Sequence, residues 1–250
     1  MFRPAGDMKR ALLVGGANGI GLSIATCLAE REECEKVYIV DKALIDKDNC
    51  NPKFEYHQFN LTSCDYSFFD QFDDIDTLMI TAGFGKLALF KDLDEQYIIN
   101  SMNINSTAVM RVIHRFYDKI QGTADFYCGV MVSIAGFMSS PFFSVYGASK
   151  AALKIFIESV NIELEKGGTT NRILNVSPGS IKGTSFNQGK TDLSQTAMLA
   201  NEIIEQLHCK ADLFIPQYDE IFKQVLARYQ KDFREEGRYS YEYKLKSGRI

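Results

Sequence analysis

The chain lacks tryptophan altogether and has few prolines and histidines. Among its 250 residues are five prolines and three histidines, and the histidines, His57, His114 and His208, stand alone in the sequence. The six cysteines form no Cys-x-x-Cys pair. Because zinc sites combine Cys and His ligands at short spacings, the sequence predicts no metal site. Unpaired cysteines are typical of free thiols in a reducing compartment.

An excess of positive charge and a long apolar run are missing as well. The formal net charge is -4, which gives no electrostatic reason to expect binding to nucleic acid or to an anionic membrane. No stretch approaches the roughly 20 apolar residues of a transmembrane helix. The segment Met1–Lys9 contains no apolar run of the signal-peptide type. We therefore expect a cytoplasmic protein with neither nucleic acid nor membrane among its partners.

The apolar segments that are present alternate between strand-like and helix-like patterns. Short buried-strand patterns occur at Arg10–Gly15, Val37–Asp41, Phe54–Asn60, Thr77–Gly83, Gly129–Ile134, Arg172–Ser177 and Asp212–Ile215. Helical periodicity lies between and after them, at Ile20–Arg31, Glu95–Ile120, Val145–Lys166, Ser194–Leu207 and Tyr218–Glu236. This alternation favours parallel strands covered by helices on both faces. The sequence therefore predicts an α/β, three-layer, doubly wound fold with a mainly parallel sheet of about seven strands.

No linker, repeat or low-complexity tract interrupts the alternation. We therefore expect one domain over residues 1–250, with an unusual C-terminal helix and tail at about residues 218–250. From Gly237 onward, tyrosines occupy alternate positions among basic residues, at Tyr239, Tyr241 and Tyr243. This pattern fits an added strand or a partner contact, and it equally fits a frayed terminus.

A glycine-rich turn follows the first predicted strand and opens the first predicted helix, with the sequence Gly15-Gly16-Ala17-Asn18-Gly19-Ile20-Gly21. The pyrophosphate of a dinucleotide must approach the backbone closely, and side chains would prevent that approach. A helix N-terminus also offers free N–H groups and the positive end of the helix dipole. A tight turn without a ligand is the alternative. The position between strand and helix favours a Rossmann-type dinucleotide site.

Asp41 lies twenty residues after Gly21, at the end of the second predicted strand. A carboxylate there accepts hydrogen bonds from the ribose hydroxyls of the adenosine and repels a ribose phosphate. The sequence therefore predicts NAD in preference to NADP. Lys42, the next residue, would weaken that repulsion. An acid that simply faces solvent at a strand end is the alternative.

Tyr146 and Lys150 are four residues apart at the start of a predicted helix, so they share one helix face. A free tyrosine titrates near pH ~10. A positive charge about 4 Å away contributes roughly 4 kcal/mol at an effective dielectric constant of about 20, which equals about three pKa units. We therefore expect Lys150 to lower the pKa of Tyr146 into the range useful for general acid–base catalysis. The same spacing also occurs by coincidence on ordinary helices.

With the glycine turn and the tyrosine–lysine pair in this order, the chain resembles the classical short-chain dehydrogenase/reductase family over about Lys9–Thr184. The resemblance implies an NAD(P)-dependent oxidoreductase that interconverts a small-molecule alcohol and a ketone by hydride transfer, with Tyr146 as the general acid/base. It implies that Ser133, thirteen residues before the tyrosine, binds the substrate oxygen.

The family also has a catalytic asparagine in the long helix before that serine. Asn103, in Met102-Asn103-Ile104-Asn105-Ser106, fits this place and would support a water-linked proton path from Lys150. Asn105 is the near rival, and the register of the segment favours Asn103.

The resemblance further implies which residues bind the cofactor. They belong to the glycine turn, to the ends of the strands, to the catalytic pair and to a Pro-Gly turn after the sixth strand. They are Gly15, Asn18, Gly19, Ile20, Gly21, Asp41, Asn60, Leu61, Ala82, Gly83, Tyr146, Lys150, Pro178, Gly179, Ile181 and Thr184. Lys150 would hold the nicotinamide ribose, and Ile181 would lie near the nicotinamide amide.

The sequence departs from the family pattern in three places. The usual threonine before the glycine turn is Val14, and the usual Asn-Asn-Ala-Gly is Ile80-Thr81-Ala82-Gly83, so we expect apolar packing to replace a polar brace. The usual Asp near the adenine is Asn60, whose amide can still hydrogen-bond the adenine. The segment after the Pro-Gly turn, Ser185–Leu193, is short. We expect Tyr218–Glu236 and the tail to complete the cover over the substrate, in the same subunit or a neighbour.

A catalytically silent dinucleotide-binding sensor or scaffold is the alternative from another functional class, but such proteins usually lose part of the tyrosine–lysine pair. Sugar-nucleotide epimerases share the fold and are generally longer. By the resemblance, the chain would form a homodimer or homotetramer through Glu95–Ile120 and Val145–Lys166. Apolar residues that can line a pocket near Tyr146 are Phe84, Leu87, Phe137, Met138, Phe142 and Phe143, although they also fit core or subunit contacts.

Overall fold

The computed structural model describes residues 7–184, 186 and 190–246. Within them lies one seven-stranded sheet with the strand order β3-β2-β1-β4-β5-β6-β7, and every pairing between its strands is parallel. The strands are β1 (Arg10–Val14), β2 (Lys36–Asp41), β3 (Phe54–Gln58), β4 (Thr77–Ile80), β5 (Tyr127–Met131), β6 (Ile173–Val176) and β7 (Leu213–Phe214). The predicted doubly wound α/β fold is confirmed.

The central strands are apolar along their whole length because both faces of the sheet are covered. Successive side chains of a strand point to opposite faces, so Leu12 packs with Leu78 in one core while Leu13 packs with Met79 in the other. All four side chains are fully buried. Each contributes roughly 1.5–3 kcal/mol through burial of apolar surface. This two-sided burial explains why the strands read as continuous apolar runs and not as alternating patterns.

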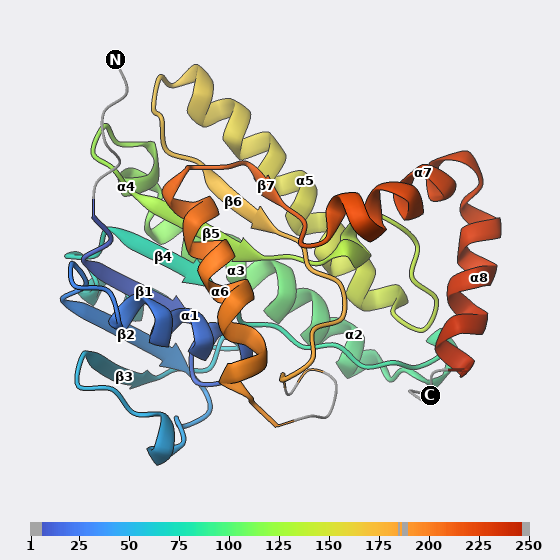
Figure 1. The fold of residues 1–250 in the computed structure, drawn as a ribbon, viewed down its shortest axis with the longest axis horizontal. Helices are drawn as coiled ribbons and strands as arrows, with labels where there is room; N and C mark the ends of the chain where they lie inside the picture. The colour runs from blue at the N-terminus through green and yellow to red at the C-terminus, as the bar shows by residue number, and fades with distance from the viewer. Residues whose placement is uncertain (1–6, 185, 187–189, 247–250) are drawn as a thin grey trace.

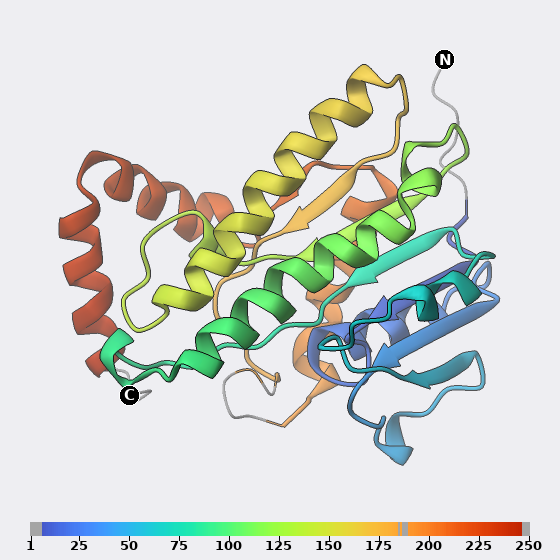
Figure 2. The ribbon, with the colours of Figure 1, turned by 180° about the vertical axis from the view of Figure 1, so that it is seen from behind.

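The helices form a layer on each face of the sheet (Figures 1 and 2). On one face, α1 (Gly19–Ala29) packs against α6 (Leu193–His208). On the other face lie α2 (Glu95–Met102), α3 (Ala108–Arg115) and α5 (Ser144–Lys166), and the short α4 (Tyr117–Gln121) follows α3. The chain leaves β1 toward β2 on one side and returns to β4 on the other. The carboxyl ends of β1 and β4 therefore flank the switch point where such sheets bind ligands.

The single helix predicted over Glu95–Ile120 is divided in the structure. A π-helical turn at Asn103–Thr107 separates α2 from α3, and the helix breaks again at Phe116 before α4. A π-helical turn inserts one residue into the helical repeat. The inserted residue therefore shifts the helical register of α3 relative to that of α2, while both helices keep an apolar face.

The C-terminal region forms two helices, α7 (Lys223–Lys231) and α8 (Phe233–Lys246), after a π-helical turn at Tyr218–Phe222. They make a bent arm beyond the carboxyl ends of β5 and β6 (Figures 1 and 2). The prediction of an added strand or a frayed end from Gly237 is wrong as far as Lys246, because Tyr241 of α8 packs on Phe142 with 4.6 Å between ring centroids. Residues 247–250 of that tail lie outside the described part. None of the described helices is both long and apolar enough to cross a bilayer.

Candidate active site

A cavity of about 920 Å³ opens at the carboxyl ends of the strands. The glycine turn, Asp41 and Asn60 line one part, Ser133 and Tyr146 line the middle, and residues of α7 and α8 line the outer part. Every residue predicted to bind the cofactor lines this cavity except Lys150, which is buried behind it. Segments that lie far apart in the sequence thus meet in one space of the size used for ligand binding.

The glycine turn is folded too tightly for side chains. Gly15 has a φ of +91°, and a Cβ at this position would lie 2.4 Å from the backbone N of Ala82. A Cβ at Gly21 would lie 2.3 Å from the carbonyl oxygen of Gly15. Helix α1 begins at Gly19 with no acidic residue in its first turn, so the positive end of its dipole is not offset. The turn and the helix start therefore fit the pyrophosphate of a dinucleotide.

The glycine turn is braced by a hydrogen bond and not by apolar packing alone. The Thr81 hydroxyl donates to the carbonyl oxygen of Gly15 at 2.8 Å. The backbone N–H groups of Thr81 and Ala82 both donate to the carbonyl oxygen of Val14, at 2.8 and 3.0 Å. The prediction that apolar packing replaces the polar brace is wrong, because the threonine at 81 supplies the hydroxyl from the other side.

The Asp41 carboxylate lies at the edge of the glycine turn. It accepts hydrogen bonds from the backbone N–H groups of Ala17 at 3.1 Å and Ala43 at 3.0 Å. These two bonds hold the carboxylate at the wall of the cavity, where it can still accept from a ligand with its remaining lone pairs. Asn60 is exposed on the same wall, and its side-chain oxygen accepts from the backbone N–H of Thr62 at 3.1 Å.

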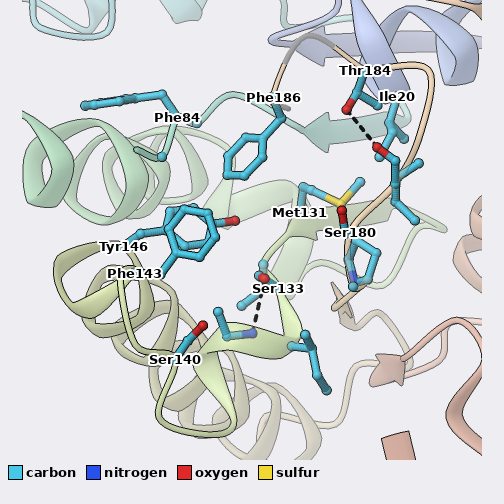
Figure 3. Close-up of a pocket in the computed structure, with 18 of the residues that line it drawn as sticks. Ile20, Phe84, Met131, Ser133, Ser140, Phe143, Tyr146, Ser180, Thr184 and Phe186 are labelled. Carbon is cyan, nitrogen blue, oxygen red and sulfur yellow. Dashed lines mark hydrogen bonds between the residues drawn. The ribbon is translucent and has the colours of Figure 1, made fainter. Parts of the chain in front are cut away.

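Tyr146 and Ser133 meet in the middle of the cavity (Figure 3). The Ser133 hydroxyl is near enough to the phenol to act on its pKa, and the Ser133 oxygen accepts from the backbone N–H of Ala135 at 3.2 Å. The Tyr146 ring is enclosed by Phe143 and Phe186, with ring centroids 5.1 and 5.3 Å away. Tyr146 is 8% exposed. The pair therefore presents two hydroxyl groups at a mostly apolar surface.

Burial moves the pKa values of Tyr146 and Lys150 in opposite directions. It raises the pKa of Tyr146 to about 12, while the hydrogen bond with Ser133 acts to lower it. Burial lowers the pKa of Lys150 to about 7. The expectation that Lys150 lowers the pKa of the phenol is wrong for this structure, in which burial is the main cause of the shift. The Lys150 Nζ donates to the carbonyl oxygen of Met131 at 2.8 Å and lies 5.8 Å from the Tyr146 ring centroid.

Of the two candidate asparagines, the structure places Asn105 in the site. Asn105 is fully buried, whereas Asn103 is exposed. A Cβ built on Gly83 would lie 3.2 Å from the Asn105 side-chain oxygen and 3.3 Å from the Lys150 Nζ. Both groups therefore flank one glycine of the cavity wall. The preference for Asn103 is wrong as to placement, because the π-helical turn shifts the register that the sequence was assumed to keep.

The Asn105 side chain joins three elements. Its nitrogen donates to the carbonyl oxygen of Phe84 at 2.8 Å, to the Ser101 hydroxyl at 3.3 Å and to the Ser149 hydroxyl at 3.2 Å. Its oxygen accepts from the backbone N–H of Phe84 at 2.9 Å. The loop after β4 is thus tied to α2 and to the helix that carries the tyrosine and the lysine.

The outer part of the cavity is only partly as predicted. Of the six apolar candidates, Phe84, Met138 and Phe143 line it. Leu87, Phe137 and Phe142 do not, and Phe142 packs on α8 instead. In the short segment Ser185–Leu193, residues 185 and 187–189 lie outside the described part, while Phe186 covers Tyr146. The C-terminal region lines the outer cavity within the same chain, which agrees with the prediction that it covers the substrate site.

Sequence reasoning missed several lining residues of the π-helical turn before α7, of α7 itself and of α8. They are Phe222, Gln224, Val225, Arg228, Glu236, Ser240 and Lys244, together with the tyrosines at 239 and 243. The helical spacing of Tyr239 and Tyr243, four residues apart, is the signal that could have placed both on one face. In the described part of the chain, no three His, Cys, Asp or Glu side chains are arranged to hold a metal ion.

Comparisons with known proteins agree with this geometry. The profile of the family described as short chain dehydrogenase matches residues 9–194. The 3-oxoacyl-[acyl-carrier-protein] reductase MabA of Mycobacterium avium is 28% identical over 190 residues, which are 72% of this chain and 69% of that protein. Three curated relatives are matched over 61–69% of their own length.

Solved structures share the fold. A short chain dehydrogenase from Burkholderia cenocepacia in complex with NADP has a TM-score of 0.72 at 19% identity, covering 91% of this chain and 94% of that one. An alcohol dehydrogenase from Thermococcus sibiricus complexed with 5-hydroxy-NADP has a TM-score of 0.68 at 19% identity, covering 83% and 95%. The chain belongs to the short-chain dehydrogenase/reductase family of NAD(P)-dependent oxidoreductases.

Proposed function

We propose that the protein interconverts a small-molecule alcohol and a ketone with a nicotinamide dinucleotide, with Tyr146 as the general acid/base. The observation that carries the proposal is that Tyr146 and Ser133 line the same cavity as the glycine turn. When bound, the nicotinamide supplies the hydride chemistry. The protein supplies position and charge.

Each polar group in the site has a distinct task in this proposal. Ser133 donates a hydrogen bond to the substrate oxygen and orients it toward Tyr146. Tyr146 passes a proton to that oxygen during reduction, and its raised pKa keeps the proton available at neutral pH. Lys150, the buried amine behind the cavity, holds the nicotinamide ribose hydroxyls. Its positive charge, once the amine is protonated, assists the reverse reaction by stabilising a phenolate.

Asn105 takes the place that the resemblance assigns to an asparagine. It lies beside Lys150 at Gly83 and fixes the loop after β4 through both hydrogen bonds to the Phe84 backbone. We assign it the role of keeping Lys150 and the loop in register. The exposed Asn103 has no part in the proposal.

NAD is the proposed cofactor in preference to NADP. Asp41, held by two backbone N–H groups at the end of β2, would accept from the ribose hydroxyls and repel a phosphate. Lys42 also lines the cavity and opposes that repulsion. The Burkholderia cenocepacia structure is an NADP complex, so the choice of cofactor is measured directly in the test below.

The exposed face of α5 supports a proposal of self-association. Ile155 and Ile162 on this helix are each 58% exposed, and large exposed apolar side chains that lie seven residues apart share a helix face. We expect a homodimer or homotetramer, to be measured by light scattering coupled to size-exclusion chromatography.

The function is tested with a panel of ketones and alcohols, supplied with NADH and NADPH and with the oxidised forms, and followed by nicotinamide absorbance. Tyr146→Phe is expected to lower kcat by about 10²–10⁴-fold, the usual contribution of a positioned acid or base. The dissociation constant for NADH is expected to stay the same, because the ring and its packing remain. Full activity of Tyr146→Phe would reject the proposed role, and NADH binding without turnover of any carbonyl would favour the silent sensor.

A further inference from the structure

The outer wall of the cavity carries an ion pair between the two C-terminal helices. The Arg228 Nε of α7 donates to one Glu236 carboxylate oxygen of α8 at 2.7 Å, and an Arg228 Nη donates to the other at 3.4 Å. Both residues line the cavity. The proposed chemistry of Ser133 and Tyr146 makes no use of this pair, which lies on a different pair of elements.

Glu236 retains hydrogen-bonding capacity toward the cavity. The residue is 7% exposed, and within the described part of the chain Arg228 alone donates to its side chain. A carboxylate has about four acceptor positions, so roughly two remain. A buried carboxylate with open acceptor positions favours a ligand that donates hydrogen bonds.

The guanidinium of Arg228 is the donor of the pair. Half of its side chain, 52%, is exposed, and the two hydrogen bonds to Glu236 use two of the five guanidinium N–H groups. The pair therefore offers donors and acceptors side by side. It carries no net charge, because each ion neutralises the other.

The other charged groups of this wall do not create an anion site. Lys244 donates to the Ser140 hydroxyl and to the Pro141 carbonyl oxygen, at 2.6 and 2.7 Å, so its charge serves to dock α8. Glu220 adds a negative charge to the same wall. The formal charges of Lys244, Glu220, Arg228 and Glu236 on this wall sum to zero, so a carboxylate or phosphate substrate gains no net electrostatic attraction here.

Two aromatic rings lie beside the ion pair. Tyr239 and Tyr243 of α8 line the cavity and are 65% and 55% exposed. Their ring faces provide flat apolar surface for a ring-shaped ligand, and the Ser240 hydroxyl lies on the same wall. Apolar faces combined with paired donors and acceptors match a molecule with a carbon ring and hydroxyl groups on its edge.

We propose that Arg228 and Glu236 recognise a neutral, polyhydroxylated ring as the substrate of this enzyme. The inference rests on the proposed function, since it names the substrate class for the reaction at Tyr146. Neighbouring hydroxyl groups donate to Glu236 and accept from Arg228, while Tyr239 and Tyr243 contact the ring. The pair also joins α7 to α8, and the experiment separates that structural role from recognition.

The experiment compares cyclohexanone, a pentahydroxycyclohexanone and an oxocyclohexane carboxylate as substrates with saturating NADH. The pentahydroxylated ketone is expected to have a kcat/KM at least about tenfold above that of cyclohexanone, because a site built for hydroxyl groups disfavours the analogue that lacks them. Glu236→Gln is expected to remove most of this preference by raising KM for the pentahydroxylated ketone. The NADH dissociation constant is expected to stay the same, because the glycine turn lies in another part of the cavity. Glu235→Gln, on the exposed side of α8, is the matched control.

A charge reversal, Arg228→Glu with Glu236→Arg, keeps an ion pair between the helices but exchanges donor and acceptor. The proposal predicts that the double variant has the melting temperature of the wild type, because the helices remain joined. It also predicts that the double variant lacks the preference for the hydroxylated ring. If the reversal restores both, the pair is only a clamp and the proposal is wrong. It is equally wrong if cyclohexanone or the carboxylate is the best substrate.

Failure of the proposed function can be distinguished from failure of the recognition proposal by a binding measurement. If no ketone is reduced, calorimetric titration of the NADH-loaded protein with the pentahydroxylated ketone still tests recognition. Binding that Glu236→Gln weakens and Glu235→Gln leaves unchanged supports the inference on its own. Absence of binding overturns it.

Discussion

Burial acts on Tyr146 and Lys150 by the same physics with opposite results. Removing a group from water disfavours its charged form, so the pKa of an acid rises and the pKa of a base falls. Tyr146 therefore stays protonated, and Lys150, with a pKa of about 7, is close to losing its proton at neutral pH. The four-residue spacing of Tyr146 and Lys150 indicates a charge contact but carries no information on this shared burial. At neutral pH the site therefore holds a neutral phenol beside an amine that is close to its pKa.

Lys150 makes the stability of the cofactor-free protein depend on pH. Its pKa falls from an ordinary value of 10.5 in the unfolded chain to about 7 in the folded protein. Between these values the unfolded chain binds a proton that the folded protein does not, so stability rises with pH and is lost as the pH falls through about 7. We expect this contribution to grow by at most about 4 kcal/mol from pH ~7 to pH ~10.

The measurement is urea unfolding of the wild type and Lys150→Met at both pH values. The difference between the two proteins isolates the lysine from other groups that titrate in this range. Equal pH dependence in both would show that the amine keeps its charge in the folded protein.

Asn105 and Asn103 form a natural pair of test and control. Asn105→Ala removes four hydrogen bonds of a buried side chain and leaves the Phe84 backbone groups without partners. We expect a loss of about 1–3 kcal/mol in unfolding free energy and a fall in kcat. Asn103→Ala, at an exposed position, is expected to change stability by less than about 0.5 kcal/mol. Thermal unfolding and NADH-dependent turnover measure both effects, and equal losses for the two variants would contradict the placement.

At the scale of elements, the end of β4 and the glycine turn depend on each other. The Thr81 hydroxyl bonds the Gly15 carbonyl oxygen, and the same oxygen lies close to where a Cβ on Gly21 would be. Thr81→Val keeps the shape and removes the donor. We expect a loss of roughly 1 kcal/mol in unfolding free energy and weaker NADH binding, read by thermal unfolding and by fluorescence titration. Unchanged NADH affinity would mean that the turn keeps its shape without the brace.

Some secondary-structure elements of this chain are predictable from the local sequence pattern, and others are not. β1 and β4 are predictable because both faces are buried, so their apolar residues run without interruption. The π-helical turn at Asn103–Thr107 leaves no such mark, because an inserted residue changes the register and not the composition. Helix α8 was misread for a related reason. Alternating tyrosines have the period of a strand. The helix is favoured by the contact of Tyr241 with Phe142 and by the hydrogen bond from Lys244 to the carbonyl oxygen of Pro141.

For the molecule as a whole, the inner part of the cavity was predictable from the sequence and the outer part was not. The glycine turn, Asp41 and the tyrosine–lysine pair sit at fixed places of a parallel sheet, so the order of strands brings them together at the switch point. Arg228 and Glu236 reach the cavity only because α7 and α8 turn back over it. That path depends on the tertiary packing of the arm, which the helical pattern over Tyr218–Glu236 does not specify.

The same arm leads to a prediction about the complete chain. Helix α8 contacts the loop that precedes α5 through Tyr241 on Phe142 and through Lys244 on Ser140 and Pro141. Phe143, next in that loop, packs on Tyr146. Ending the chain at Asp232 removes these contacts and opens the outer cavity. We expect KM for a carbonyl substrate to rise at least about tenfold, with kcat lowered as well, because the loop beside Tyr146 loses its support.

NADH affinity is expected to change little in the shortened protein, since the glycine turn and Asp41 lie in another part of the cavity. Steady-state kinetics and NADH titration therefore separate the two ends of the site. Tyr241→Ala in the full-length chain is the milder control, and it should reproduce part of the kcat effect while leaving the wall of α8 in place. An unchanged KM after truncation would show that the substrate is bound without the arm.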